Sequence, residues 1–162
     1  MPGGHRRTTS EFIETSITSN FVHRPGFWIM YAFLVLGAWV TLRTLFMQLD
    51  AATIWTITLQ AHAVISFILL HWIRGTPESS LGQPGEDVAH LTFWEQIDGG
   101  KFFGTPTRRF FTLMPIAIFF LSLIWTQENL AMLACNSVST LLLIVAKMEA
   151  LFGARLFGLN KD

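Results

Sequence analysis

The side chains that could bind a metal ion or a haem are few, and their spacing suits neither. The chain has five histidines: His5, His23, His62, His71 and His90. None forms the H-x-x-x-H or H-x-x-H-H pair that a membrane di-iron oxygenase needs several times over. His62 and His71 share one predicted helix, and no other predicted membrane helix carries a histidine to complete a haem site. We therefore expect no metal centre, and we interpret His62 as a hydrogen-bonding partner between helices.

A second candidate chemistry is acyl transfer by the segment HLTFWEQID. It places His90, Glu95 and Asp98 close together in sequence. Acyl transfer also needs a nucleophile and donors for an oxyanion, and the segment supplies neither. The one cysteine, Cys135, lies in an apolar run, where a small buried hydrophobe is expected. We therefore predict that the chain is not an enzyme and has no cofactor of its own; a small lipid-modifying enzyme is the least favoured interpretation.

These groups belong to an unusually apolar chain. Of its 162 residues, 51% are hydrophobic and 14% are charged, against about 25% charged residues in ordinary soluble domains. The mean hydropathy is +0.46 and the formal net charge is zero. Composition therefore predicts a membrane protein and does not favour a nucleic-acid partner. A signal peptide is not expected, because the start is polar and the following apolar run is too long for an h-region.

Four apolar segments are predicted to cross the membrane as helices, which makes the chain an all-α membrane protein. They are residues 26–46, 53–73, 110–125 and 130–152. A span needs about 20 apolar residues, so the third is short and is expected to lean on a neighbour. Pro115 is placed in its first turn, where a missing N–H costs little. Short links join the spans in pairs, which predicts two antiparallel hairpins.

The basic residues decide the expected orientation. With four spans, the tail 1–25, the loop 74–109 and the tail 153–162 lie on one side, together with ten of the eleven Lys and Arg residues. The positive-inside rule therefore predicts that both termini and the loop between the second and third helices are cytosolic. Arg43, near the opposite turn, and Lys147, near the tails, are expected to snorkel to the two interfaces.

Polar side chains inside the spans are interpreted as contacts between helices. Asn136 and Ser139 fall on one face of the fourth span, and Gln60 lies in the middle of the second. A transport pathway is less favoured, because no intramembrane acid or inverted repeat accompanies them. Trp28 and Tyr31, at the start of the first span, are expected to be interfacial aromatics.

The segment LTFWEQIDGGKFFGTPTRRFF, residues 91–111, is polar and aromatic between two apolar runs. It predicts one helical turn at the membrane interface, ended by the glycine pair, with side chains from Trp94, Glu95, Gln96 and Asp98. Arg108 and Arg109 then precede the third span and are expected to bind lipid phosphates. A folded loop of this kind without catalytic groups suggests contact with a partner protein.

Several segments resemble the signature sequences of the Orm/ORMDL family. They are HWIRGTPE, LTFWEQIDGGKFF, RRFFTLMPIAIFFL and ARLFGLNKD. IWTITLQAH and CNSVS also resemble parts of the family's second and fourth helices. The similarity extends from about Gly26 to Lys161 and so covers most of the chain.

The resemblance implies a function that composition does not. Orm/ORMDL proteins are endoplasmic-reticulum membrane proteins that bind serine palmitoyltransferase, the pyridoxal-phosphate enzyme that begins sphingolipid synthesis. They restrain the enzyme when ceramide is plentiful. By resemblance, this chain is a regulatory subunit whose partners are the catalytic subunits and the small activating subunit, with ceramide as its ligand and pyridoxal phosphate on the partner. The alternative is a general endoplasmic-reticulum scaffold or trafficking adaptor without ceramide sensing.

The resemblance also implies positions for ligand and partner. The N-terminal segment of family members approaches the enzyme's substrate tunnel, and ceramide holds it there. The family's ceramide-contacting asparagine corresponds to Thr18 here, with Asn20 two residues later, and either side chain can bond an amide or hydroxyl. The apolar residues expected to flank the ceramide chains are Phe21, Phe27, Leu69 and Phe93. Those expected to dock the partner are Trp94, Glu95, Gln96, Asp98, Arg108, Arg109, Arg155 and Asn160.

The tail segment RRTTS predicts one regulatory feature. Two arginines precede Thr8, Thr9 and Ser10, which is a weak basic-directed kinase pattern. A phosphate there adds about two negative charges and would draw the tail away from an anionic membrane or partner.

Overall fold

A computed structural model describes residues 21–74, 91–97 and 104–151 of the chain. Several residues singled out in the sequence lie outside these ranges: Thr8, Thr9, Ser10, Thr18, Asn20, Asp98, Arg155 and Asn160.

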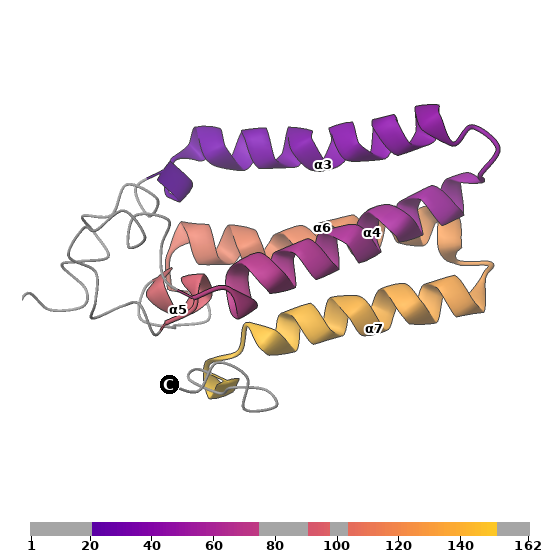
Figure 1. The fold of residues 1–162 in the computed structure, drawn as a ribbon. Coiled ribbons are helices and arrows are strands. Elements are labelled where there is room, and N and C mark those ends of the chain that lie inside the picture. The colour runs from indigo at the N-terminus through magenta and orange to yellow at the C-terminus, as the bar shows by residue number, and fades with distance from the viewer. Residues whose placement is uncertain (1–20, 75–90, 98–103, 152–162) are drawn as a thin grey trace, which may run out of the picture.

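Four long helices lie alongside one another in up-and-down order (Figure 1). They are α3 (Pro25–Leu45), α4 (Ala51–Phe67, continued by a π-helix Ile68–Trp72), α6 (Pro106–Thr126) and α7 (Leu130–Ala146). A four-residue helix, α5 (Phe93–Gln96), comes between α4 and α6, and a 3₁₀ turn, Glu149–Leu151, follows α7. Across the described ranges, the β-pairing is one isolated bridge between Arg74 and Thr92.

The bundle has two different ends (Figure 1). Both tight turns, α3–α4 and α6–α7, lie at one end, which we call the turn end. The start of α3, the short helix α5 and the residues after α7 lie at the opposite end, which we call the loop end. The start of α3, the described part of the loop and the residues that directly follow α7 therefore share one end, as the even number of spans predicted.

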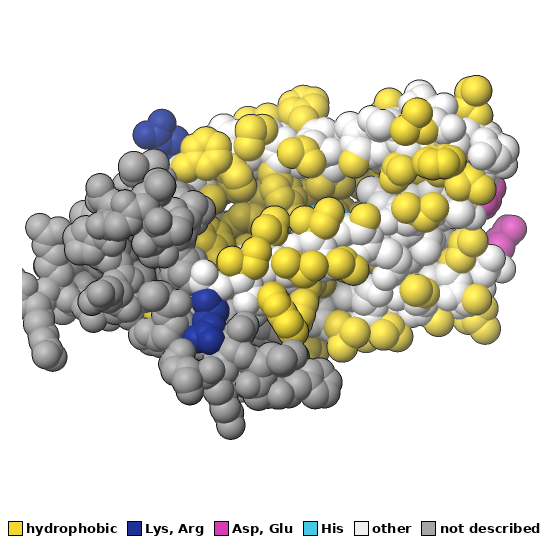
Figure 2. Space-filling view, viewed as in Figure 1, with side chains coloured by type: hydrophobic (Ala, Val, Ile, Leu, Met, Phe, Trp, Pro, Cys, Tyr) yellow, Lys and Arg dark blue, Asp and Glu magenta, His cyan; other side chains and the backbone are white. Residues whose placement is uncertain are grey.

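The helices have the length and composition of membrane spans. Within the described ranges, α3, α4 with its π-helix, and α6 are 21, 22 and 21 residues long and apolar enough to cross a membrane, and α7 is a shorter apolar helix. Figure 2 shows hydrophobic side chains over much of the outer face, with basic groups at the loop end and acidic groups at the turn end. These observations confirm the predicted membrane-helix character.

The third helix begins earlier than the sequence analysis placed it. It starts at Pro106 rather than residue 110, because Thr105 accepts a hydrogen bond from Arg108 N as N-cap and Pro106 occupies the first turn. The helix is therefore not short. Pro115 lies inside it, not in its first turn, and is buried. Arg108 and Arg109, which were assigned to the loop, thus belong to the first turn of the helix.

The fourth helix ends earlier than expected, at Ala146 rather than 152. Cys135, on this helix, is exposed on the outer surface, so the expectation that it is buried was wrong. An apolar run has a lipid-facing side as well as a packed side, and Cys135 falls on the former.

A polar network joins α4, α6 and α7 midway along the bundle. Gln60 Nε2 donates to Asn136 Oδ1 (3.2 Å), and Ser139 Oγ donates to Gln60 Oε1 (2.7 Å). Asn136 Nδ2 donates to Thr56 Oγ1 (3.2 Å) and Ser122 Oγ (3.4 Å). The prediction that these side chains hold helices together is confirmed for Gln60, Asn136 and Ser139.

Helix α3 packs more loosely, and none of its residues is fully buried. The Tyr31 hydroxyl is hydrogen-bonded to His62 Nε2 at 2.8 Å, which confirms the interhelical role expected of His62. Tyr31 therefore points into the bundle rather than to the interface. Nearer the turn end, Trp39 and Trp55 stack with ring centroids 5.1 Å apart. At the last turn, Arg43 donates to the carbonyls of Met47 and Leu49 and closes the α3–α4 link.

Candidate functional site

The short helix α5 at the loop end is held by its own side chains. Thr92 Oγ1 accepts from Glu95 N (3.4 Å), and Glu95 Oε2 accepts from Thr92 N (2.8 Å), which is a complete capping box. Gln96 Nε2 donates to the carbonyl of Leu91 (3.0 Å). These bonds satisfy backbone groups that a single helical turn otherwise leaves open. The turn is therefore well defined, although it is far too short to be stable alone.

Arg108 fixes this turn against α6. Its side chain is 0% exposed, and Nε donates to the carbonyl of Ile97 at 2.6 Å. A second guanidinium nitrogen donates to the carbonyl of Trp94. The guanidinium carbon also lies 4.3 Å from the Trp94 ring centroid, within the range of a cation–π contact. Arg108 thus caps the C-terminal carbonyls of α5 and packs on its aromatic side chain.

Trp94 carries these contacts on to two further helices. Its ring lies 5.6 Å from that of His71, at the end of α4. Its Nε1 donates to the carbonyl of Lys147 at 3.3 Å, and Lys147 Nζ lies 5.7 Å from the ring centroid. Lys147 is 0% exposed, so the expectation that it snorkels to the interface was wrong. The Trp94 side chain therefore connects the ends of α4 and α7 with the start of α6.

The N-terminal segment of the described chain rests on the same cluster. Val22 is buried with Leu70, Trp94, Ile97 and Phe111, which we call the loop-end cluster. The Trp28 indole donates to the carbonyl of Val22 (3.0 Å). The segment just before α3 is thereby tied to α5 and α6.

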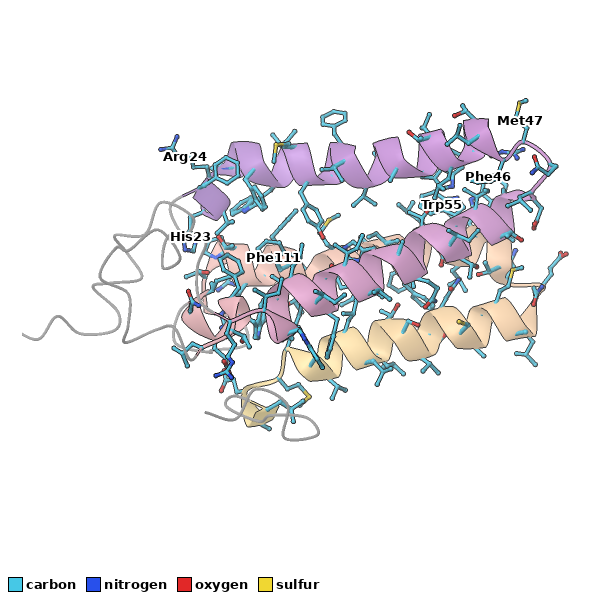
Figure 3. All side chains as sticks on the ribbon, viewed as in Figure 1. His23, Arg24, Phe46, Met47, Trp55 and Phe111 are labelled. Carbon is cyan, nitrogen blue, oxygen red and sulfur yellow. The ribbon has the colours of Figure 1, made fainter. Side chains whose placement is uncertain are left out.

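A polar contact adds to this anchoring. His23 Nδ1 and Thr107 Oγ1, both at the loop end, are 2.5 Å apart, and Thr107 is fully buried. Figure 3 shows His23 directed toward the start of α6, whereas Arg24 points away from the bundle. The loop end therefore holds the residues just before α3 in a defined place. Its polar side chains, such as His23 and Thr107, bond to each other.

The sequence as a whole also matches a known protein family. The family model described as the ORMDL family matches residues 16–155.

The chain belongs to the ORMDL family.

Individual relatives cover nearly the whole of this ORMDL-family chain. ORM1-like protein 1 of Homo sapiens is 33% identical over 150 residues, which are 91% of this chain and 94% of the relative. ORM1-like protein 3 of Mus musculus is 31% identical over 149 residues, with the same coverage of each chain. An uncharacterized protein of Schizosaccharomyces pombe is 31% identical over 150 residues, which are 91% of this chain and 76% of that protein. The resemblance read from the sequence is confirmed.

The ligand residues expected from the ORMDL resemblance fall into two groups. Phe21 and Phe27 lie together, with ring centroids 5.3 Å apart, and Phe27 also packs on Phe111 (5.9 Å). Phe93 packs against the loop-end cluster. Leu69 is 53% exposed on the outer side of the π-helix. All four apolar candidates thus lie at the loop end, but Leu69 is directed outward, whereas the other three pack on one another or on the loop-end cluster. Contact with ceramide stays a prediction.

The docking residues expected in this ORMDL chain are mostly turned inward. Trp94, Glu95, Gln96 and Arg108 are buried, whereas Arg109 is exposed. Arg108 was expected to bind lipid phosphates, but it binds the backbone carbonyls of Ile97 and Trp94. Docking of a partner by these residues stays a prediction. The buried ones would contribute to docking indirectly, because they hold α5 in its conformation.

Residues that the sequence analysis missed are Val22, His23, Thr107 and Lys147. Thr107 had a recognisable signal, because it follows a Thr-Pro helix start. Val22 and His23 had none, since their partners lie far away in sequence.

The His23–Thr107 bond leads to a first prediction. Thr107→Val keeps the shape of the buried side chain and removes its hydroxyl, so amides of residues 21–24 should exchange with deuterium about three to ten times faster, as expected for one lost hydrogen bond. Thr44→Val is the matched control, because Thr44 is exposed and bonds its own helix at the turn end. Equal exchange in both variants would show that the hydroxyl does not anchor the segment.

Proposed function

We propose that this chain is a non-catalytic regulatory subunit that inhibits serine palmitoyltransferase when ceramide is abundant. It resides in the endoplasmic-reticulum membrane, with the loop end and both termini in the cytosol. Its partners are the enzyme's catalytic subunits and small activating subunit, and pyridoxal phosphate belongs to the enzyme. Ceramide is its regulatory ligand, and the result is feedback control of sphingolipid synthesis.

The observation that carries this proposal is a family match that begins at residue 16, and so includes the segment leading to Val22 and His23. These two residues tie the start of the described chain to the loop-end cluster and to α6. An inhibitory segment that starts from a defined point loses less freedom on binding than a free one. Phe21, which is 49% exposed beside Phe27, offers apolar surface for a lipid chain at that point.

The charge distribution supports the proposed orientation. Arg24, Arg74 and Arg109 lie at the loop end, whereas Asp50 and Glu128 lie at the turn end. Basic residues gather on the cytosolic side of membrane proteins, where the leaflet is anionic.

The test is co-purification followed by a ceramide titration. Tagged full-length chain is purified from its own membranes, and the synthase activity that accompanies it is measured as ceramide is added. We expect synthase activity to fall with ceramide, and to stop responding when the chain is absent. A co-purifying synthase whose activity is the same at every ceramide concentration would indicate a scaffold instead. Absence of any co-purifying synthase would contradict the proposal as a whole.

The ceramide contact can be assigned by two matched variants. Asn20→Ala should raise the ceramide concentration for half-inhibition about tenfold, as expected for one lost hydrogen bond to a buried head group. Thr18→Val should leave it unchanged. The opposite pattern would assign the contact to Thr18, and no change in either variant would place it elsewhere.

A further inference from the structure

The two helical hairpins of the bundle differ in apolar length. Helix α3 and α4 with its π-helix are 21 and 22 residues long, and their single charged residue, Arg43, bonds to carbonyls beyond the end of α3. Helix α7 is 17 residues long. Helix α6 begins with a turn that contains Arg108 and Arg109, which leaves residues 110–126 as its apolar length. At 1.5 Å per residue, the first hairpin fits an apolar layer of about 32 Å and the second a layer of only about 25 Å.

The difference is located at the loop end. Helices α4 and α7 run in the same direction, and Ser139 Oγ donates to Gln60 Oε1, so these two residues lie at one height. Nine residues further along each helix, Leu69 and Met148 therefore lie at about the same height, and both are about half exposed. There α4 continues as an apolar π-helix, whereas α7 has already ended and charged residues lie on both sides of Met148.

The outer side of the second hairpin has the character of a lipid-facing surface. We call it the short face, and define it by residues of α6 and α7 that are more than half exposed: Leu113, Phe120, Ile124, Leu130, Val138 and Leu142. Trp125, also exposed, lies at the turn end of this face, where an interfacial aromatic residue is expected. The exposed Arg109 lies at its loop end. The face is thus bounded at both ends by residues typical of a membrane interface.

Tilting the bundle in the membrane does not remove the difference. Asn136 on α7 donates to Thr56 on α4 and to Ser122 on α6, so these helices are joined and tilt together. A tilt that fits α4 to a hydrocarbon layer of about 30 Å shortens the vertical extent of α7 still further. The lipid beside the second hairpin must therefore adapt to the protein.

We propose that the short face binds phospholipids with short acyl chains, so that the bilayer is thinned along α6 and α7 and the bundle is most stable in a thin membrane. A longer-chained lipid at this face must either compress or draw the charged residues at the loop end into hydrocarbon, and both are unfavourable. The inference depends on helix lengths and on the hydrogen bonds that join the helices, and it holds whether or not the chain regulates a synthase.

The first test is thermal unfolding of the full chain in nanodiscs that differ only in acyl-chain length. The series is dimyristoleoyl-, dipalmitoleoyl-, dioleoyl-, dieicosenoyl- and dierucoyl-phosphatidylcholine. We expect the highest unfolding temperature in the two shortest lipids and a value about 5 °C lower in the longest. An unfolding temperature that does not depend on chain length would overturn the proposal and would favour a protein helix as the occupant of the short face. A maximum in the longest lipids would also overturn it.

Two variants show which hairpin sets the preferred lipid. The double variant Arg109→Leu/Glu149→Leu lengthens the apolar part of α6 and α7, so its maximum should move to longer chains. Arg24→Leu makes the same kind of change beside the first hairpin and should leave the maximum in place. Only the position of the maximum is compared, so a general loss of stability in a variant does not affect the result. An unmoved maximum in the double variant would contradict the proposal.

The second test locates the thinning on one side of the bundle. Met148→Cys and Leu69→Cys, each combined with Cys135→Ser, are treated with a water-soluble maleimide in dioleoyl-phosphatidylcholine nanodiscs. We expect the cysteine at position 148 to react about tenfold faster, because the one at position 69, at the same height, is in hydrocarbon. Equal rates at the two positions would show that the bilayer has the same thickness on both sides and would overturn the proposal.

Discussion

Replacing Arg108 with methionine is expected to release the α5 turn and lower the free energy of unfolding by about 2–4 kcal/mol. Methionine fills much of the space but donates no hydrogen bond. The carbonyls of Trp94 and Ile97 would then be buried without the donor they now share. The change is measured as a fall in the thermal unfolding temperature in lipid nanodiscs, together with faster deuterium exchange in residues 93–97.

The neighbouring arginine provides the control for Arg108. Arg109→Met removes the same charge from an exposed position of the same helix and should change stability little. Arg108→Lys should behave like Arg108→Met, because an ammonium cannot bind two carbonyls and stack on a ring in the same geometry. A stable Arg108→Met variant with an unchanged α5 would show that the guanidinium does not hold the turn.

The second large effect is expected from Asn136→Leu in the network between α4, α6 and α7. Asn136 is 0% exposed and makes hydrogen bonds to Gln60, Thr56 and Ser122. At an average of about 0.6 kcal/mol for each such bond in a membrane, their loss costs about 2 kcal/mol. We expect a lower unfolding temperature and separation of α4 from α7, read by spin-label distances between the two helices.

Ser137→Ala is the matched control in the same turn of α7. Ser137 donates to the carbonyl of Leu133 in its own helix, so its loss touches no other helix. If both variants lowered the unfolding temperature equally, the network would not be what joins the helices.

The helices and several of their contacts could be predicted from local patterns. Apolar runs of span length identify the helices, and two short links force antiparallel neighbours. A polar side chain in a span needs a partner, which is why the roles of Gln60, His62 and Asn136 followed from their positions. The start of the third helix was also readable, since Thr105 and Pro106 are a regular helix start, but the arginines beside them suggested a loop.

The inward direction of Arg108 and Lys147 could not be predicted in this way. A basic residue at the end of a span is ordinarily directed to the lipid surface. Here the partners come from elsewhere in the chain. Arg108 binds carbonyls eleven and fourteen residues earlier, and Lys147 lies beside a tryptophan 53 residues away, whose indole donates to its carbonyl. No local pattern encodes such partners, so the loop-end cluster becomes visible only in the folded chain.

Hydrogen bonds join α4, α6 and α7, whereas α3 is more loosely attached, and this difference has a consequence for biosynthesis. Helices α3 and α4 leave the ribosome first, yet the hydrogen-bonding partners of Gln60 and Thr56 lie on α7, the last helix of the bundle. Until the second hairpin has been inserted, those side chains of α4 face lipid or the insertion machinery with their polar groups unmatched. A nascent chain halted after α4 therefore exposes these polar groups of Gln60 and Thr56 within the bilayer, and insertion of α7 provides their partners.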